Sequence, residues 1–157
     1  MTSLYLLLLA LVVAAPPAGA APKTQFLVVP GRSMGPVVIG MRLQAVEGIL
    51  GRPTKVDASG PTQWYEWKDP ENRFRSIAVE TLQNGVVLIS LAHDPRFRTI
   101  DGLGDGTPLA DVERVLGRPS SVLNLGGFSI AQYRRTGIGF VTDGSGRVTG
   151  IVVAPGV

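Results

Sequence analysis

Acid–base chemistry in this chain would have to involve His93, because it is the only histidine in 157 residues and cysteine is absent. His93 precedes Asp94, but neighbouring side chains on a strand point to opposite faces, which keeps the two from acting on one substrate. We expect His93 to lie in a connector after a strand. The sequence holds no G-x-S-x-G turn and no recognisable set of nucleophile, base and acid. It therefore predicts no catalytic residues and a protein that is not an enzyme.

The segment from Asp101 to Gly106 is the one that most resembles a ligand-binding loop. A calcium loop needs oxygen ligands at alternating positions and a distal glutamate, whereas a phosphate loop needs a longer glycine pattern and a lysine. The segment offers neither, so we expect a tight turn there. One histidine and no cysteine also make a zinc site a poor fit. We predict that the chain binds no metal and no cofactor.

Aromatic side chains gather in one short segment, Trp64-Tyr65-Glu66-Trp67. On a strand, Trp64 faces one side of the sheet while Tyr65 and Trp67 face the other. Exposed aromatic side chains are frequent anchors in protein interfaces, and buried ones fill cores. We assign Tyr65 and Trp67 to the core and predict that Trp64 contacts a binding partner.

The arginines are dispersed along the chain, which carries a net charge of +3 without any run of basic residues. Nucleic-acid proteins usually concentrate such charge on one face, so we predict no nucleic-acid partner. Arg73 and Arg75 join Trp64 on the surface that we expect to bind a partner, the concave face of the combined sheets. Arg52 and Arg118 directly follow two predicted helices, where they either complement the helix C-terminal carbonyls or border the same binding surface.

The N-terminus has the pattern of a secretory signal peptide over residues 1–20. An unbroken apolar run from Leu4 to Ala15 precedes a proline pair and Ala18-Gly19-Ala20, an A-x-A cleavage site. The run is too short to cross a bilayer as a helix, which needs about 20 residues. We predict an exported protein, periplasmic or extracellular, without a stable membrane anchor after cleavage. Retention of the segment as an uncleaved anchor is the alternative.

An internal repeat organises the rest of the chain, because residues 39–53 align without gaps on residues 105–119. We predict an N-terminal segment at 21–38 with an edge strand at 25–29, a first repeat at 39–94 and a second at 95–157. The identical pairs are Gly40/Gly106, Leu43/Leu109, Val46/Val112, Glu47/Glu113, Leu50/Leu116, Gly51/Gly117, Arg52/Arg118 and Pro53/Pro119.

Each matched stretch predicts one short helix followed by antiparallel strands. Apolar residues recur at spacings of three and four, and Gly117 and its counterpart Gly51 mark the helix ends. Thr107 has the side chain of an N-cap. The expected fold class is α+β, with two tandem helix-plus-meander units packed as one pseudo-symmetric domain. Expected strands are 62–68, 74–80, 86–92, 122–125, 128–134, 138–142 and 147–153, with a hairpin turn at Asn84-Gly85.

A short helix written G-x-x-x-x-x-V-x-x-x-L-G-x-P, followed by a meander, resembles the SmpA/OmlA (BamE-type) family and the tandem fold of the beta-lactamase inhibitory protein. The residues that carry this resemblance are Gly40, Val46, Leu50, Gly51 and Pro53, with Gly106, Val112, Leu116, Gly117 and Pro119. The resemblance implies an exported, non-enzymatic module whose sheet or loops contact another protein.

These observations together predict a non-enzymatic protein that binds a protein partner in the cell envelope or outside the cell, as an assembly accessory or an inhibitor. Two alternatives stay open. A module that binds a small ligand or a cell-wall glycan would need a sizeable apolar pocket. A structural surface protein would associate with itself.

Overall fold

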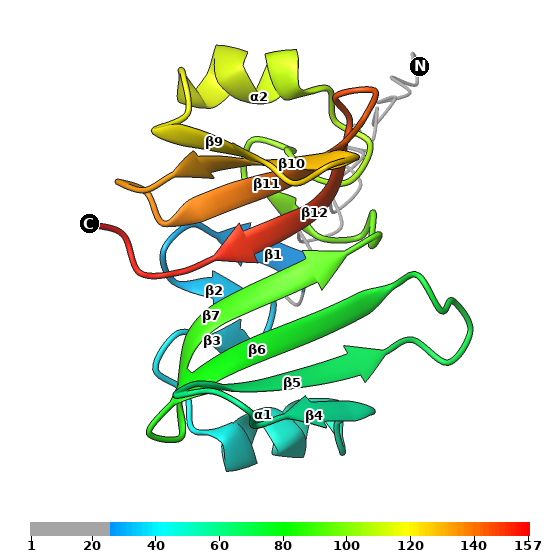
Figure 1. The fold of residues 1–157 in the computed structure, drawn as a ribbon, viewed down its shortest axis with the longest axis vertical. Coiled ribbons are helices and arrows are strands. Elements are labelled where there is room, and N and C mark those ends of the chain that lie inside the picture. The colour runs from blue at the N-terminus through cyan, green and yellow to red at the C-terminus, as the bar shows by residue number, and fades with distance from the viewer. Residues whose placement is uncertain (1–25) are drawn as a thin grey trace, which may run out of the picture.

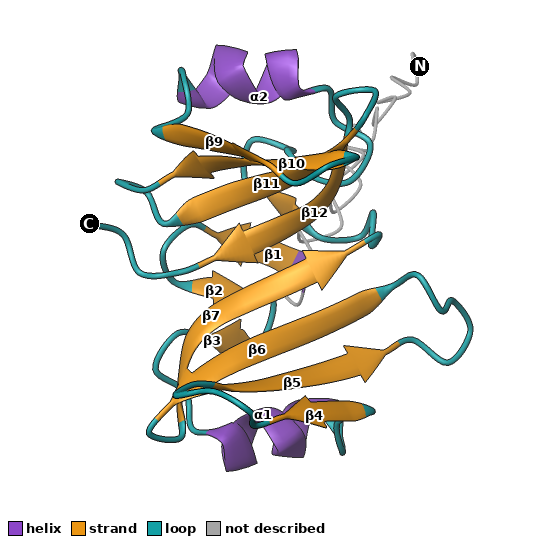
Figure 2. Ribbon diagram, in the orientation of Figure 1, coloured by secondary structure: helices purple, strands orange, loops and turns teal. Residues whose placement is uncertain are grey.

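The computed structural model describes residues 26–157, so the predicted signal peptide lies outside the described residues. The described chain contains twelve strands and two helices of eight residues each (Figure 2). Their bounds are β1 Leu27–Val29, β2 Ser33–Met34, β3 Val37–Val38, α1 Leu43–Leu50, β4 Lys55–Asp57, β5 Gln63–Lys68, β6 Ser76–Leu82, β7 Gly85–Ala92, β8 Arg98–Thr99, α2 Leu109–Leu116, β9 Ser121–Asn124, β10 Phe128–Tyr133, β11 Ile138–Asp143 and β12 Val148–Val153.

Eight of the strands form one large antiparallel sheet in the order β4-β5-β6-β7-β12-β11-β10-β9. Its centre is the pairing of β7 with β12, in which Ile89 lies opposite Val153 and Leu91 lies opposite Ile151. This pairing joins strands from the two sequence-matched parts of the chain into a continuous sheet. The helices lie at opposite ends of the long axis of the molecule, α1 near β4 and α2 near β9 (Figure 1).

The other four strands form a small sheet behind the large one, in the order β3-β2-β1-β8 (Figure 1). Val28 of β1 is paired with Thr99 of β8 in parallel and with Met34 of β2 in antiparallel orientation. The strand expected at 25–29 is therefore present in part, but it has a neighbour on both sides and is not an edge strand.

One hydrophobic core lies between the large sheet, the small sheet and the two helices. Each helix contributes one fully buried valine, Val46 from α1 and Val112 from α2. The large sheet contributes every second residue of its strands, for example Tyr65 and Trp67 of β5, because side chains alternate between the faces. The intervening residues lie on the other face of the large sheet, which the small sheet and the helices leave uncovered.

Both helices end at the predicted glycines, Gly51 and Gly117, each with a φ of 80°. The N–H of Gly51 donates to Glu47 O, and that of Gly117 to Glu113 O, both at 2.8 Å. Thr107 does not cap α2, because its Oγ1 accepts a hydrogen bond from Gly104 N at 3.1 Å. Among the described residues, no helix has the length and apolar character needed to cross a membrane.

The predicted α+β class is wrong, because strands predominate and the two helices are short. The arrangement as two tandem helix-plus-meander units in one pseudo-symmetric domain is also wrong. Neither matched part has a sheet of its own, since both contribute strands to the same large sheet. The second sheet, which the sequence did not predict, combines the segment before α1 with β8 from the connection before α2.

Candidate binding groove

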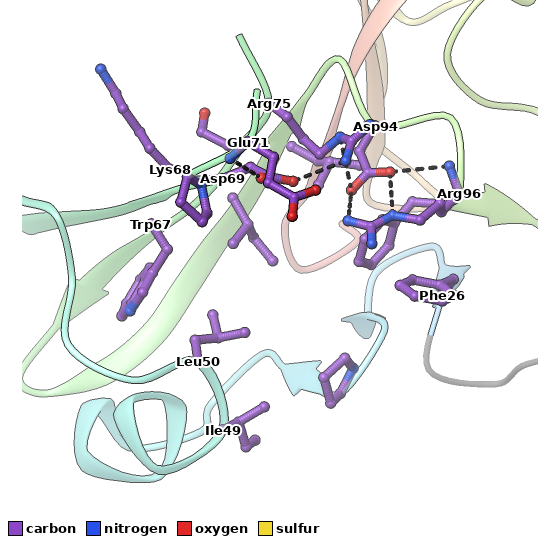
Figure 3. Close-up of a pocket in the computed structure, with 16 residues that line it drawn as sticks. Phe26, Ile49, Leu50, Trp67, Lys68, Asp69, Glu71, Arg75, Asp94 and Arg96 are labelled. Carbon is purple, nitrogen blue, oxygen red and sulfur yellow. Dashed lines mark hydrogen bonds and ion pairs between the residues drawn. The ribbon is translucent and has the colours of Figure 1, made fainter. Parts of the chain in front are cut away.

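A groove of about 560 Å³ lies beside α1, on the face of the large sheet that also carries the core (Figure 3). Trp67 and Leu91 of the large sheet line its floor, and Leu50 of α1 closes one side. Phe26 and Pro36 come from the N-terminal segment. Two loops, at 68–76 and 93–97, complete the wall, so the groove depends on parts of the chain that are distant in sequence.

Each of the two loops contains an Asp-Pro dipeptide at its turn, Asp69-Pro70 in the first and Asp94-Pro95 in the second. In the first, Asp69 Oδ1 accepts a hydrogen bond from Glu71 N at 2.8 Å. In the second, Asp94 Oδ1 accepts one from Arg96 N at 3.1 Å. Aspartate side chains often organise turns in this way, by bonding to the backbone two residues further on. The turns bring Asp69 and Asp94 to the same side of the groove.

Arg75 connects the two loops. Its guanidinium donates to Asp69 Oδ2 at 2.9 Å, and its Nε lies 3.8 Å from Asp94 Oδ2. Arg96 holds Asp94 from the other side with two hydrogen bonds, of 2.9 Å from Nε and 2.6 Å from a terminal nitrogen (Figure 3). The bidentate Arg96–Asp94 pair fixes both direction and distance, and Arg75 joins it to Asp69, so the four side chains form one connected network.

The carboxylate of Asp94 is the centre of this network, because its side chain is only 3% exposed. Burial by itself would raise the pKa of Asp94, but hydrogen bonds from Arg96 and the charges of Arg96 and Arg75 outweigh it. The pKa of Asp94 is therefore lowered, and the group stays ionised. The Nε of Arg75 is buried and has no hydrogen-bond partner within the described residues.

The lining of the groove combines an apolar floor with a charge-balanced rim. Arg96 also packs on the aromatic wall, with its guanidinium 4.9 Å from the centre of the Phe26 ring. The apolar lining residues are Phe26, Pro36, Ile49, Leu50, Trp67, Pro70, Ile77, Leu91 and Phe97. The charged ones are Lys68, Asp69, Glu71, Arg75, Asp94 and Arg96. The groove can bury an apolar group, while polar groups beside it meet charges of either sign.

Three of the five residues predicted to bind a partner lie near the loop at 68–76, but they do not form one surface. Arg75 lines the groove. Arg73 is exposed, with its guanidinium 4.9 Å from the centre of the Phe74 ring. Trp64 is half-buried on the uncovered face of the large sheet, where Lys55 Nζ lies 5.6 Å from its ring centre.

The remaining two, Arg52 and Arg118, are exposed directly after α1 and α2. Because the helices lie at opposite ends of the molecule, these two arginines are far apart (Figure 1). Neither makes a side-chain hydrogen bond or an ion pair among residues 26–157. The structure therefore does not bring the predicted residues together on the concave face where we expected them.

The sequence patterns did not point to the residues that organise the groove, namely Asp69, Asp94 and Arg96. The repeated Asp-Pro dipeptide at 69–70 and 94–95 is a turn signal that could have pointed to them. No sequence pattern shows that two such turns face each other across Arg75, because that contact depends on the pairing of β6 with β7.

His93 lies in a connector, exposed, with a φ of 51° and its ring centre 6.4 Å from that of Phe74. It does not act with Asp94, whose carboxylate is held by arginines. In the described part of the chain, no three acidic, histidine or cysteine side chains are grouped so that they could hold a metal ion.

Comparison with known proteins identifies a fold and no family. No family model matches the chain, and no curated protein matches it. An extracellular protein containing an SCP domain from Bacillus anthracis has a similar structure, with a TM-score of 0.54, 10% identity, and coverage of 91% of this chain and 50% of that one. A cysteine-rich secretory protein from Staphylococcus aureus gives a TM-score of 0.53, 14% identity, and coverage of 85% and 48%.

The chain thus spans about half the length of these two structures. The predicted resemblance to the SmpA/OmlA (BamE-type) family and to the beta-lactamase inhibitory protein is wrong, since the similar structures belong to SCP-domain proteins. The physical reason is that the motif behind it specifies little. A valine, a leucine and a final G-x-P fix one turn of packing and a helix end, and many folds use such an element.

Proposed function

We propose that this chain is an exported, non-catalytic binding protein whose groove holds an apolar side chain from an extended segment of a protein partner. The observation that carries the proposal is the apolar floor beside α1, bordered by three cationic and three anionic side chains, among which the buried carboxylate of Asp94 holds Arg75 and Arg96. Preorganised grooves lose little entropy on binding, which favours recognition.

Export is supported by two independent features. The first is the apolar run from Leu4 to Ala15 with its A-x-A site. The second is that both proteins of similar fold are extracellular or secretory. We place the partner in the cell envelope or outside the cell.

A polypeptide suits the mixed character of the groove. An extended peptide presents an apolar side chain beside backbone amides and, frequently, a charged neighbour. The floor accepts the apolar side chain, and the rim offers both the exposed cation Arg96 and the exposed anion Glu71. A ligand of one charge alone would meet repulsion from half of the rim.

A non-catalytic role is supported by the state of the groove's carboxylates. Asp69 and Asp94 are both bound to arginines, and the pKa of Asp94 is lowered. A general acid at neutral pH needs a raised pKa, and a general base needs free lone pairs directed at the substrate. Asp69 and Asp94 offer neither.

A small ligand is the second candidate, because the groove volume falls within the range of about 300–1,000 Å³ typical of ligand sites. A glycan is disfavoured, since sugar rings stack on exposed aromatic faces. Trp67 is only 6% exposed, and its Nε1 donates to Gly51 O at 2.9 Å.

The test compares two matched helix positions. Ile49 borders the groove and Val115 occupies the corresponding place on α2, and their side chains are 46% and 45% exposed. Tagged chains carrying Ile49→Glu or Val115→Glu are expressed in the native host, crosslinked, captured and identified by mass spectrometry. We expect Ile49→Glu to lose a protein that the wild type and Val115→Glu both retain. Equal capture by all three would contradict the proposal.

A further inference from the structure

The second hollow of the molecule, a trough of about 500 Å³, lies on the uncovered face of the large sheet, opposite the groove. Its floor is formed by the central strands β7, β10, β11 and β12. The solvent face of an antiparallel sheet is normally polar. Here it carries Leu88, Ile130 and Val152, while the same face of β5 carries Trp64, Glu66 and Lys68. The apolar character continues from the trough toward β9, where Leu123 lies opposite Ile130, and gives way to polar residues at β5.

Gly139 opens a slot in the middle of this surface. It is paired with Gln132 on one side and Val152 on the other. A Cβ placed on it would lie 3.6 Å from Ile130 Cγ2 and 3.8 Å from Val152 Cβ, both ordinary contacts. The backbone does not require glycine here, and a branched residue would suit a strand better. The glycine leaves a gap between two apolar side chains.

Arginines predominate at one end of the trough. Arg134 is the single charged side chain among those that line it, and Arg135 follows it in the chain. The α-carboxylate of Val157 lies at the same end, where Val157 N donates to Arg134 O at 3.1 Å, so the arginines exceed it by one charge. Neither arginine makes an ion pair within residues 26–157. The acidic side chains on this face lie outside the lining. Glu80, opposite Leu88 on the next strand, accepts a hydrogen bond from Thr62. Asp143 lies opposite Phe128 and bonds to its own turn. An anionic group would complement the arginine end.

The body of the ligand cannot be rich in hydrogen-bonding groups. The strands of the floor are paired on both sides, so their backbone N–H and C=O groups are already bonded. Gln132, a polar lining residue, bonds through its Oε1 to Ser121 Oγ at 2.9 Å. A peptide laid in the trough would leave its own amides without partners, which costs free energy, whereas an alkyl chain has none to satisfy.

We infer that the trough binds a single-chain anionic amphiphile, with its alkyl chain over Gly139 and its head group at Arg134. This inference does not depend on the proposed function of the groove, because the two sites lie on opposite faces of the sheet and share no lining residue. It gives the protein a second ligand, of the fatty-acid class.

The test titrates the full exported chain with dodecanoate, dodecanol and dodecyltrimethylammonium, followed by calorimetry and by amide shifts in nitrogen–proton correlation spectra. We expect dodecanoate to bind most tightly and to shift the signals of Gly139 and Val152. Gly139→Val should weaken binding about tenfold, the loss for roughly two methylene groups left unburied. Gly139→Ala, whose Cβ makes only ordinary contacts, should weaken dodecanoate binding less than Gly139→Val does. The alanine variant provides the test if the valine variant does not fold.

The arginine end is tested separately. Arg134→Gln should weaken dodecanoate about threefold and remove its advantage over dodecanol, as expected for one exposed charge. Arg118→Gln, an exposed arginine outside the trough, is the matched control and should have no effect. The inference is overturned if dodecanoate shifts signals elsewhere, if Gly139→Val and Gly139→Ala bind like the wild type, or if dodecyltrimethylammonium binds equally well. Tighter binding of an alternating Val-Leu hexapeptide would also overturn it and assign the trough to polypeptides.

Discussion

Two segments of the chain contain the same series of elements but differ in the hollow beside them. We call residues 43–92 the first helical segment and residues 109–153 the second helical segment. Each contains a helix that ends at a glycine, followed by four strands. They differ in the connection between the second and third strands, which spans 69–75 in the first segment and only 134–137 in the second. The longer connection supplies Asp69 and Arg75 to the network around Asp94, so only the first segment has the groove.

The difference teaches that the matched residues alone do not make the groove: Leu50 is matched and lines it, but the charged network comes from unmatched residues. The matched residues fix how each helix packs, as the full burial of Val46 and Val112 shows. The unmatched connection decides what lies beside the helix. In the second segment the short turn leaves Arg134 and Arg135 exposed at the end of an apolar trough.

The largest expected effect comes from breaking the network that only the first segment has. Asp94→Ala removes the carboxylate that lies 3.8 Å from the buried Nε of Arg75. We therefore expect the free energy of unfolding to fall by about 3 kcal/mol. The value lies at the low end for a broken buried pair because Arg96 is half exposed. Urea denaturation measures it.

The control for this variant is Asp143→Ala, at the end of β11 in the second segment, where Asp143 Oδ1 accepts hydrogen bonds from the backbone N–H groups of Ser145 and Arg147. If the two substitutions destabilised the protein equally, Asp94 would be an ordinary turn residue. The network would then not explain why the groove is confined to one segment.

The second prediction concerns two aromatic residues at matched positions, each 16 residues after its glycine helix end. Trp67 Nε1 donates to Gly51 O, whereas the buried hydroxyl of Tyr133 has no partner in the described chain. Trp67→Phe should cost about 2 kcal/mol through the lost bond and lost packing. Tyr133→Phe should be neutral or slightly stabilising, because it removes an unsatisfied group. If urea denaturation showed equal losses of unfolding free energy for Trp67→Phe and Tyr133→Phe, the predicted difference between the two positions would be wrong.

The pH dependence of stability should differ between the Asp94 network beside the first segment and Tyr133 of the second segment. The pKa of Asp94 is lowered below its ordinary value near 3.8, so the stability that it provides is present above that pH and is lost as the pH falls further. The pKa of Tyr133 is raised above 10.0, by burial first and by Glu113 second, so stability falls as the pH rises above 10.0.

We therefore expect Asp94→Asn to flatten the acid limb of a plot of unfolding free energy against pH, and Tyr133→Phe to flatten the alkaline limb. Each limb should change by about 1.4 kcal/mol for every unit of difference between the folded and unfolded pKa. Chemical denaturation at fixed pH values measures both limbs. An unchanged alkaline limb in Tyr133→Phe would show that another group controls it.

The smallest effect is expected from the exposed helix positions. Ile49→Glu and Val115→Glu both place a charge on a surface that is nearly half exposed, so each should change stability by less than about 0.5 kcal/mol. Thermal unfolding measures this directly. A marked loss in Ile49→Glu alone would mean that the groove side of α1 is part of the core, and its binding phenotype would then reflect unfolding.

Much of the large sheet and both helix ends could be predicted from the sequence, because apolar periodicity and glycine positions are local signals. The hairpin expected at Asn84-Gly85 forms one residue earlier, with positive φ at Gln83 and Asn84, and Gly85 already belongs to β7. The small sheet was missed because strands such as β2 and β3 have two residues each, too few to show a period.

The groove could not be predicted for a similar reason. Asp94 and Arg75 are distant in sequence and meet only because β6 pairs with β7. Candidate residues chosen by type alone were scattered, with Arg52 and Arg118 at opposite ends of the molecule. Residue types indicate what chemistry is available, whereas long-range strand pairing decides which residues meet.

Site-specific photocrosslinking tests the central claim most directly. A photoreactive phenylalanine analogue is placed at Ile49 or at Val115, two matched and equally exposed positions, and the exported protein is irradiated in its native host. The proposed binding of a partner segment in the groove predicts a discrete protein adduct from position 49 and none from position 115. Adducts of the same proteins from both positions, or none from position 49, would contradict it.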